Sequence, residues 1–244
     1  MTSKRKYSLS PGFFVLRLLA LLIGCSGLIW GISNVARGTV SDELQNLEYR
    51  LLQFETFNQT TGMRTLAGPT AEEEGLSACD SHAQRALLLL EMPLADAALR
   101  SGAVQDFDLH IQSLESRSRQ ALACAPRDSL AWLLLFGIQV EYGRLDDHSF
   151  NFLDTSYETS PTEAWVSVRR MAVALPVVIA APEPVRQKVL AEFQNLVRNR
   201  FLDIPALSYL NAHAPLRALL QSRIEELDPL SQAAFSQALL RLRR

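Results

Sequence analysis

An apolar run near the start of the chain restricts its folding more than any other feature. From Gly12 to Ile32 the sequence reads GFFVLRLLALLIGCSGLIWGI, with Arg17 as its single charged residue. A helix of about 20 apolar residues is long enough to cross the hydrocarbon core of a bilayer. Arg17 lies near the start of the run, where a long side chain can extend to the lipid headgroups. The sequence therefore predicts one membrane-spanning helix over residues 11–33.

The charges in front of this run predict its orientation. Lys4, Arg5 and Lys6 precede it, and basic residues beside a spanning helix favour the cytoplasmic side. Residues 1–10 then form a cytoplasmic tail, and the chain beyond Trp30 lies outside the cytoplasm. We expect an uncleaved signal-anchor in a bacterial inner membrane, with the C-terminal domain in the periplasm.

Two other interpretations of the run remain open. The first is a cleaved secretory signal, which needs small residues at its cleavage site, and residues 34–36 (Asn-Val-Ala) match this pattern poorly. The second is a lipoprotein signal, because residues 22–25 (Leu-Ile-Gly-Cys) resemble a bacterial lipobox in which Cys25 is lipidated. Lipoproteins usually turn polar after this cysteine, whereas here the chain stays apolar as far as Trp30.

Small residues occupy one face of the expected span. They are Ala20, Gly24, Gly27 and Gly31, and residues 27–31 form a G-x-x-x-G pattern. Small side chains let two helix backbones approach closely in lipid, so this face suits a homodimer or another membrane helix. Glycine is also common in membrane helices that lack such a role.

The charge of the remaining chain argues against one class of partner. The whole chain carries 24 basic and 26 acidic residues, and five basic but no acidic residues fall in the first 40. The rest therefore has 24 − 5 = 19 basic residues against 26 acidic ones, a net charge of −7. Nucleic-acid binding depends on Lys and Arg side chains that neutralise phosphates. We expect no nucleic-acid partner.

Residues 34–76 are expected to connect the span to the domain. After a short turn at 33–41, apolar residues recur at heptad-like spacing and predict a helix over 41–57. This stripe consists of Val40, Leu44, Leu47, Leu51 and Phe54. It would pack on the domain, the membrane surface, a partner, or a second copy as a stalk. Residues 58–77 are rich in Thr, Gly and acidic side chains, which is typical of a linker.

Residues 77–244 predict one all-α domain. Apolar residues recur at helical spacing, caps and prolines mark the helix ends, and residues 177–179 are too few to form a sheet. The expected helices are 83–92 stopped by Pro93, 94–100 ended by Gly102, 106–124, 129–141, 145–157, one starting at Ser160-Pro161 and broken at Pro176, 184–200 with Val185, Val189, Phe193, Leu196, Val197 and Phe201 on one face, and three opened by Pro205, Pro215 and Pro229.

The two cysteines of this domain are candidates for a disulfide. Cys79 begins one expected helix and Cys124 ends another, so antiparallel packing would bring them together. Oxidising conditions outside the cytoplasm favour the bond, which would close a loop of about 45 residues. Two buried thiols are the alternative. Neither cysteine has a C-x-x-C partner, so no zinc site is expected.

An internal echo begins at Pro126. Residues 126–132 read PRDSLAW and residues 160–165 read SPTEAW, so Ala-Trp recurs after 33 positions. A period near 34 with one helix–turn–helix per unit is typical of tetratricopeptide repeats, and residues 126–200 resemble this family in degenerate form. The matching positions are Trp132, Leu135, Phe152 and Pro161, with Trp165 repeating the first. Phe136 and His148 depart from the pattern. The resemblance implies a TPR-like stack of helical hairpins that binds proteins, and it implies no chemistry.

The search for chemistry finds no catalytic, nucleotide-binding or metal-binding motif. The four histidines lack ligand spacing, and Asp146-Asp147-His148 stands at a helix start, where acidic residues act as caps. We therefore expect no cofactor and no enzymatic activity.

The hypothesis for function is a membrane-anchored periplasmic scaffold or adaptor for protein partners. It would act in a bacterial envelope assembly, secretion or polysaccharide machine through the inner face of the repeat pair, with Trp132 and Trp165 in the core. The alternatives are a lipoprotein assembly cofactor lipidated at Cys25 and an envelope enzyme with an unrecognised site.

Overall fold

The computed structural model describes residues 11–53, 59–67 and 79–243; in α1 and α2 it leaves out the side chains of 11–17, 32–41, 59, 61, 64 and 67. Over these residues all regular structure is helical, which confirms the predicted all-α class. In chain order the elements are α1 (Pro11–Leu52), α2 (Gln59–Ala67), α3 (Ser81–Ser101), α4 (Val104–Cys124), α5 (Ser129–Glu141), α6 (Asp147–Thr159), α7 (Ala164–Ala174), the 3-10 helix η1 (Leu175–Ala180), α8 (Glu183–Arg198), α9 (Asp203–Asn211), α10 (Ala214–Glu225) and α11 (Pro229–Leu242).

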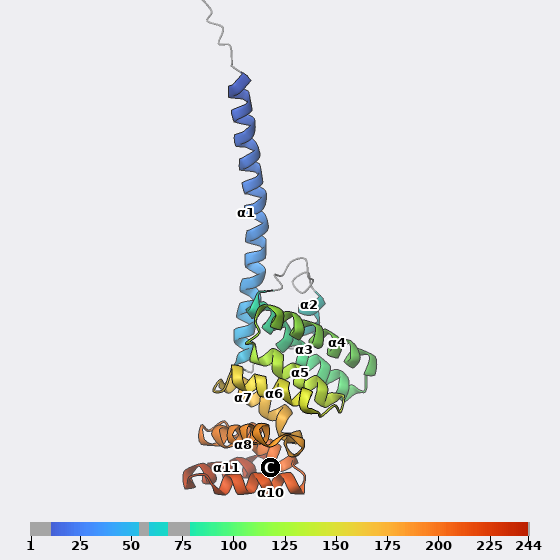
Figure 1. Cartoon of the computed structure of the whole chain (residues 1–244), viewed down its shortest axis with the longest axis vertical. Coiled ribbons are helices and arrows are strands. Elements are labelled where there is room, and N and C mark those ends of the chain that lie inside the picture. The colour runs from blue at the N-terminus through green and yellow to red at the C-terminus, as the bar shows by residue number, and fades with distance from the viewer. Residues whose placement is uncertain (1–10, 54–58, 68–78, 244) are drawn as a thin grey trace, which may run out of the picture.

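Helix α1 is a single rod of 42 residues, about 63 Å long at 1.5 Å per residue. The turn predicted at 33–41 is wrong: this stretch has one glycine and no proline, and a lone glycine costs a helix only about 1 kcal/mol. Figure 1 shows the N-terminal half of α1 standing clear of the other helices. Across the described residues, no helix combines the length and the apolar character that a membrane crossing requires.

The C-terminal end of α1 packs on the domain. Leu44 and Leu51 are 2% and 7% exposed and lie in apolar clusters with side chains of α3, and the half-buried Leu47 packs beside them. Of the options for the heptad-like stripe, packing on the domain is the one observed for these residues. The side chains of Val40 and Phe54, the other members of the stripe, lie outside the described residues, as does the expected linker apart from α2.

The remaining helices form successive layers that lead away from the free end of α1 (Figure 1). Helix α3 packs against α4, α5 against α6, and α7 against α8, while α4 and α7 both contact α5. Helices α9, α10 and α11 close the far end of the molecule. One apolar cluster joins α1, α3, α4 and α5, and a larger one extends from α5 to α11.

Helix α3 continues through Pro93, where the sequence predicted a stop. An internal proline costs a helix about 3 kcal/mol or more because it removes one N–H donor and crowds the preceding turn. Leu90 and Leu94 on either side are both buried, and burying a leucine contributes about 1.5–3 kcal/mol. Core packing therefore outweighs the cost of the proline, and one helix replaces the two that were expected. Its C-cap is Gly102, as predicted for the second of them, and this glycine has a positive φ of 73°.

The C-terminal elements confirm some predicted boundaries and correct others. Helix α5 begins and ends as predicted, and Pro205, Pro215 and Pro229 lie in the first turns of α9, α10 and α11. Helix α7 starts at Ala164 and not at Ser160-Pro161, because Ser160 is instead the C-cap of α6. Residues 177–179 lie in η1. Phe201 is 44% exposed and off the buried face of α8, which ends at Arg198.

Candidate functional site

The protruding half of α1 exposes large apolar side chains on all sides. Their exposed fractions lie between 52% and 72%, and the residues are Leu18, Leu19, Leu21, Leu22, Ile23, Leu28, Ile29 and Trp30. Ala20 is also exposed, and a Cβ placed on Gly24, Gly27 or Gly31 would meet nothing within 4 Å. Cys25 is a free, exposed cysteine on the same helix. The small-residue face is therefore uncovered in the described residues.

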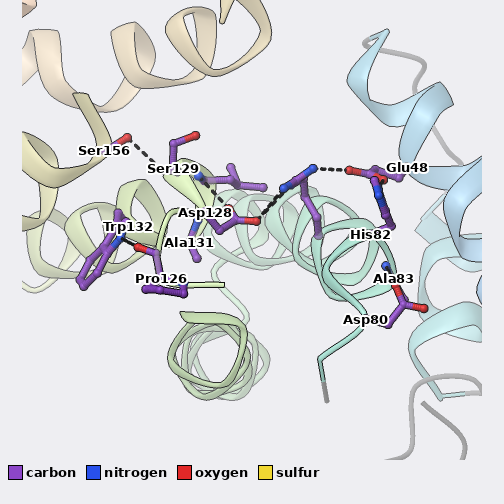
Figure 2. Close-up of polar contacts among 12 residues, drawn as sticks. Glu48, Asp80, His82, Ala83, Pro126, Asp128, Ser129, Ala131, Trp132 and Ser156 are labelled. Atoms are coloured by element: carbon purple, nitrogen blue, oxygen red, sulfur yellow. Dashed lines mark hydrogen bonds and ion pairs between the residues drawn. The ribbon is translucent and has the colours of Figure 1, made fainter. Parts of the chain in front are cut away.

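A polar network fixes the other end of α1 to the domain (Figure 2). The buried carboxylate of Glu48 accepts a hydrogen bond from Arg85 Nη1 at 2.7 Å and lies 2.6 Å from His82 Nδ1, both on α3. Arg85 Nη2 also donates to Asp128 Oδ2 at 2.9 Å, at the start of α5. Burial lowers the pKa of Arg85, but the carboxylates of Asp128 and Glu48 outweigh it and raise that pKa overall. One arginine thus joins three helices.

Two residues of α7, one helical turn apart, add further contacts between α1 and the domain. Arg169 donates from Nη2 to the carbonyl of Leu51, in the last turn of α1, at 3.0 Å. Burial lowers the pKa of Arg169 to about 10, so it stays charged at neutral pH. Trp165 contacts two guanidinium groups, since the Cζ atoms of Arg85 and Arg169 are each 5.6 Å from its ring centroid. The orientation of α1 relative to the domain therefore rests on polar bonds as well as apolar packing.

Asp128 is the residue of this network whose replacement tests two bonds at once. Its Oδ1 caps α5 by accepting from the backbone N–H groups of Leu130 and Ala131, and its Oδ2 binds Arg85. Asp128→Ala is expected to lower the free energy of unfolding by about 2 kcal/mol, at the upper end for a lost N-cap. Urea unfolding followed by circular dichroism measures this. Asp228→Ala, which removes the exposed cap of α11, is the control and should cost less.

The predicted disulfide is present. Cys79, just before α3, is bonded to Cys124, the last residue of α4, so the bond joins the start of one helix to the end of its antiparallel neighbour.

The predicted capping role of Asp146 is also confirmed, since it forms a capping box with Ser149 at the start of α6. The backbone N–H of Ser149 lowers the pKa of Asp146 below its usual value.

A cleft of about 710 Å³ opens between α6, α7 and α8. Its lining comprises Tyr157, Glu158, Pro161, Thr162, Ala164, Ser167, Lys188, Ala191, Glu192, Asn195, Leu196, Asn199 and Phe201. Clefts of 300–1,000 Å³ are the usual size of ligand sites.

A buried ion pair supports the floor of this cleft. Arg170 of α7 is fully buried and donates from Nη2 to Glu192 Oε1 of α8 at 2.7 Å. It also donates to the carbonyls of Ser156 and Ser160 at the end of α6, at 2.7 and 2.9 Å. The phenol of Tyr157 donates to Glu192 Oε2 at 2.9 Å. Burial, reinforced by the carboxylate of Glu192, raises the pKa of Tyr157 well above its usual value, so this donor stays protonated.

The repeat positions named from the sequence occupy different environments. Leu135 and Phe152 are buried as core residues. Trp132 is half-buried, stacks on Phe152 and donates its indole N–H to the Pro126 carbonyl at 2.8 Å. Trp165 is half-buried and contacts the two arginines described above, so it is only partly in the core. Pro161 is exposed and lines the cleft.

Sequence reasoning missed Arg170, Glu192 and the cleft itself. A charged residue in an amphipathic helix is ordinarily assigned to the solvated face, so neither member of the buried pair stood out. One signal was present: Arg170 lies four residues after Val166 and one before Met171, on the apolar face of α7, where both neighbours are buried.

The described residues hold no group of three or more His, Cys, Asp or Glu side chains placed to bind a metal ion. Comparisons with protein-family models, with curated proteins and with solved structures found no match to this chain. The functional argument therefore rests on the chain's own geometry.

Proposed function

We propose that the protein is a membrane-anchored scaffold or adaptor of the bacterial envelope. Its N-terminus lies in the cytoplasm, α1 crosses the inner membrane once, and the helical domain binds protein partners in the periplasm. The observation that carries the proposal is the run of exposed apolar side chains around the protruding half of α1. Burying one such leucine or isoleucine contributes about 1.5–3 kcal/mol, so leaving the whole run in water is unfavourable.

A lipid bilayer is the cover that best suits this helix. The apolar side chains lie on all sides of the rod, whereas a docked protein would need only one stripe. The run Gly12–Ile32 has the length for one span, and basic residues precede it. The hydrogen bond of Glu48 to α3 and that of Leu51 to α7 would hold the domain at a set orientation relative to the membrane.

The adaptor role is supported by the helical layers and the cleft. The degenerate tetratricopeptide-like pattern of residues 126–200 favours a surface for protein partners, in an assembly, secretion or polysaccharide machine. The small-residue face of Ala20, Gly24, Gly27 and Gly31 would be available in lipid for a homodimer or another membrane helix.

Membrane fractionation with paired substitutions tests the anchor. Leu22→Lys with Ile29→Lys is expected to release the protein from the membrane pellet after carbonate extraction, because a central lysine costs a span about 2.5–3.5 kcal/mol. Leu99→Lys with Leu109→Lys, at exposed apolar positions of α3 and α4, is the matched control and should stay in the pellet. Equal behaviour of the two variants would reject the anchor.

Reporter fusions after Arg244 test the orientation. A periplasmic phosphatase fused there is expected to be active, and a reporter that fluoresces only in the cytoplasm is expected to be dark. The opposite pattern would overturn the proposed topology.

The lipoprotein alternative is favoured by one observation, the free and exposed Cys25. Under the spanning proposal, Cys25→Ala keeps the protein in the membrane pellet and labelled fatty acid is not incorporated into the original chain. Incorporation of the label that is lost in Cys25→Ala would support lipidation instead.

A further inference from the structure

We infer that the cleft between α6, α7 and α8 binds an extended segment of the partner protein that carries a lysine or arginine side chain. This inference rests on the proposed adaptor function and names the chemistry of its partner. Three properties of the cleft lead to it: an exposed carboxylate, the unused hydrogen-bonding groups of two amide side chains at the C-terminal end of α8, and several apolar lining residues.

The end of the cleft formed by α6 is electronegative. Glu158 lines it, is exposed, and has no ion-pair or hydrogen-bond partner within the described residues. It lies in the last turn of α6, and the C-terminal end of a helix carries a partial negative charge. The other charges of the lining are compensated, since Glu192 pairs with Arg170 and Lys188 with Asp154. The uncompensated charge there is a carboxylate, which a cation complements.

The amides of α8 suit the backbone of an extended peptide. Asn195 accepts a bond from Arg198 through Oδ1, which leaves its Nδ2 as a donor, and Asn199 uses Nδ2, which leaves its Oδ1 as an acceptor. Both side chains line the cleft and are exposed. A peptide unit offers one C=O and one N–H, so the pair matches it.

The cleft also has apolar lining residues. They include Pro161, Ala164, Ala191 and the exposed Phe201. A lysine or arginine carries a long aliphatic stem that packs on such a surface while its charged end reaches a carboxylate. An isolated small cation would leave these residues uncovered. The combination therefore favours a basic residue within a polypeptide.

Fluorescence anisotropy with the full chain in lipid nanodiscs tests the inference. The probe is a labelled, end-blocked hexapeptide with a central lysine beside leucine and alanine, and matched peptides carry norleucine or glutamate in its place. We expect the lysine peptide to bind more tightly than both. Glu158→Gln should weaken its binding about three- to fivefold, as for a partly exposed ion pair, and remove its advantage over norleucine. Asp108→Asn, an exposed acid on α4, is the control.

A second variant tests the place of binding. Ala191→Trp fills the cleft and is expected to weaken binding at least tenfold, while Ala233→Trp on the exposed side of α11 should leave binding unchanged. The inference would be overturned if the lysine peptide did not bind or if the norleucine peptide bound equally well. It would also be overturned if Ala191→Trp bound the lysine peptide fully, or if butylammonium alone competed equally tightly. The fractionation and reporter results do not depend on the cleft. If the peptide-binding inference fails, the proposal of a membrane-anchored adaptor is unaffected.

Discussion

Replacing Arg170 with alanine is expected to destabilise the domain by about 3–5 kcal/mol, the range found when one partner of a buried ion pair is removed. The guanidinium is fully buried and bonded to Glu192. Its loss would leave the Glu192 carboxylate buried with Tyr157 as its remaining donor. The carbonyls of Ser156 and Ser160 would lose their bonds as well.

Urea unfolding of the full chain, followed by circular dichroism, measures this effect. Arg100→Ala is the matched control, because Arg100 pairs with Asp96 four residues earlier on the exposed surface of α3. Such pairs contribute about 0.3–0.5 kcal/mol. If Arg170→Ala were as mild as this control, the buried pair would not hold α6, α7 and α8 together.

A double replacement separates charge from packing. Arg170→Met with Glu192→Leu removes both charges and keeps similar volumes, so much of the lost stability should return. The cleft would keep its apolar lining residues but lose the bond that fixes Tyr157. Stability and peptide binding can therefore be measured on the same variant.

Local signals in the sequence predicted some of the helix boundaries. The helix over 129–141 was predicted with both ends correct, and the structure shows Asp128 as its N-cap, whose carboxylate accepts from the N–H groups of the first turn. Gly102 predicted the end of α3 because glycine adopts a positive φ without strain. These residues act on their immediate neighbours, so their effect can be read without the tertiary structure.

The predictions that were wrong depend on contacts far along the chain. Pro93 stops an isolated helix, but its neighbours in α3 pack into the core, which the local pattern does not contain. Ser160 has the right sequence context for a helix start, yet its carbonyl binds Arg170. The cleft was missed for the same reason, because its lining residues lie between Tyr157 and Phe201 in the chain and three helices bring them together.

Replacing both Cys79 and Cys124 with serine is expected to lower the free energy of unfolding by about 4 kcal/mol. In the chain-entropy model a cross-link stabilises by restricting the unfolded chain, and a loop of 45 residues gives about this value. The bond ties the start of α3 to the end of α4, and α3 is the helix against which the C-terminal end of α1 packs. Loss of the bond should therefore also weaken the packing of Leu44 and Leu51 on the domain.

The unfolding midpoint in urea, with and without a thiol reductant, measures this effect. The original chain should lose stability when reduced, because both cysteines are exposed and accessible, whereas the double serine variant should not respond. Cys25→Ser is the control, since Cys25 lies on the protruding half of α1 and forms no bond there. Equal midpoints for the oxidised and reduced chain would mean that packing between α3 and α4 alone determines their stability.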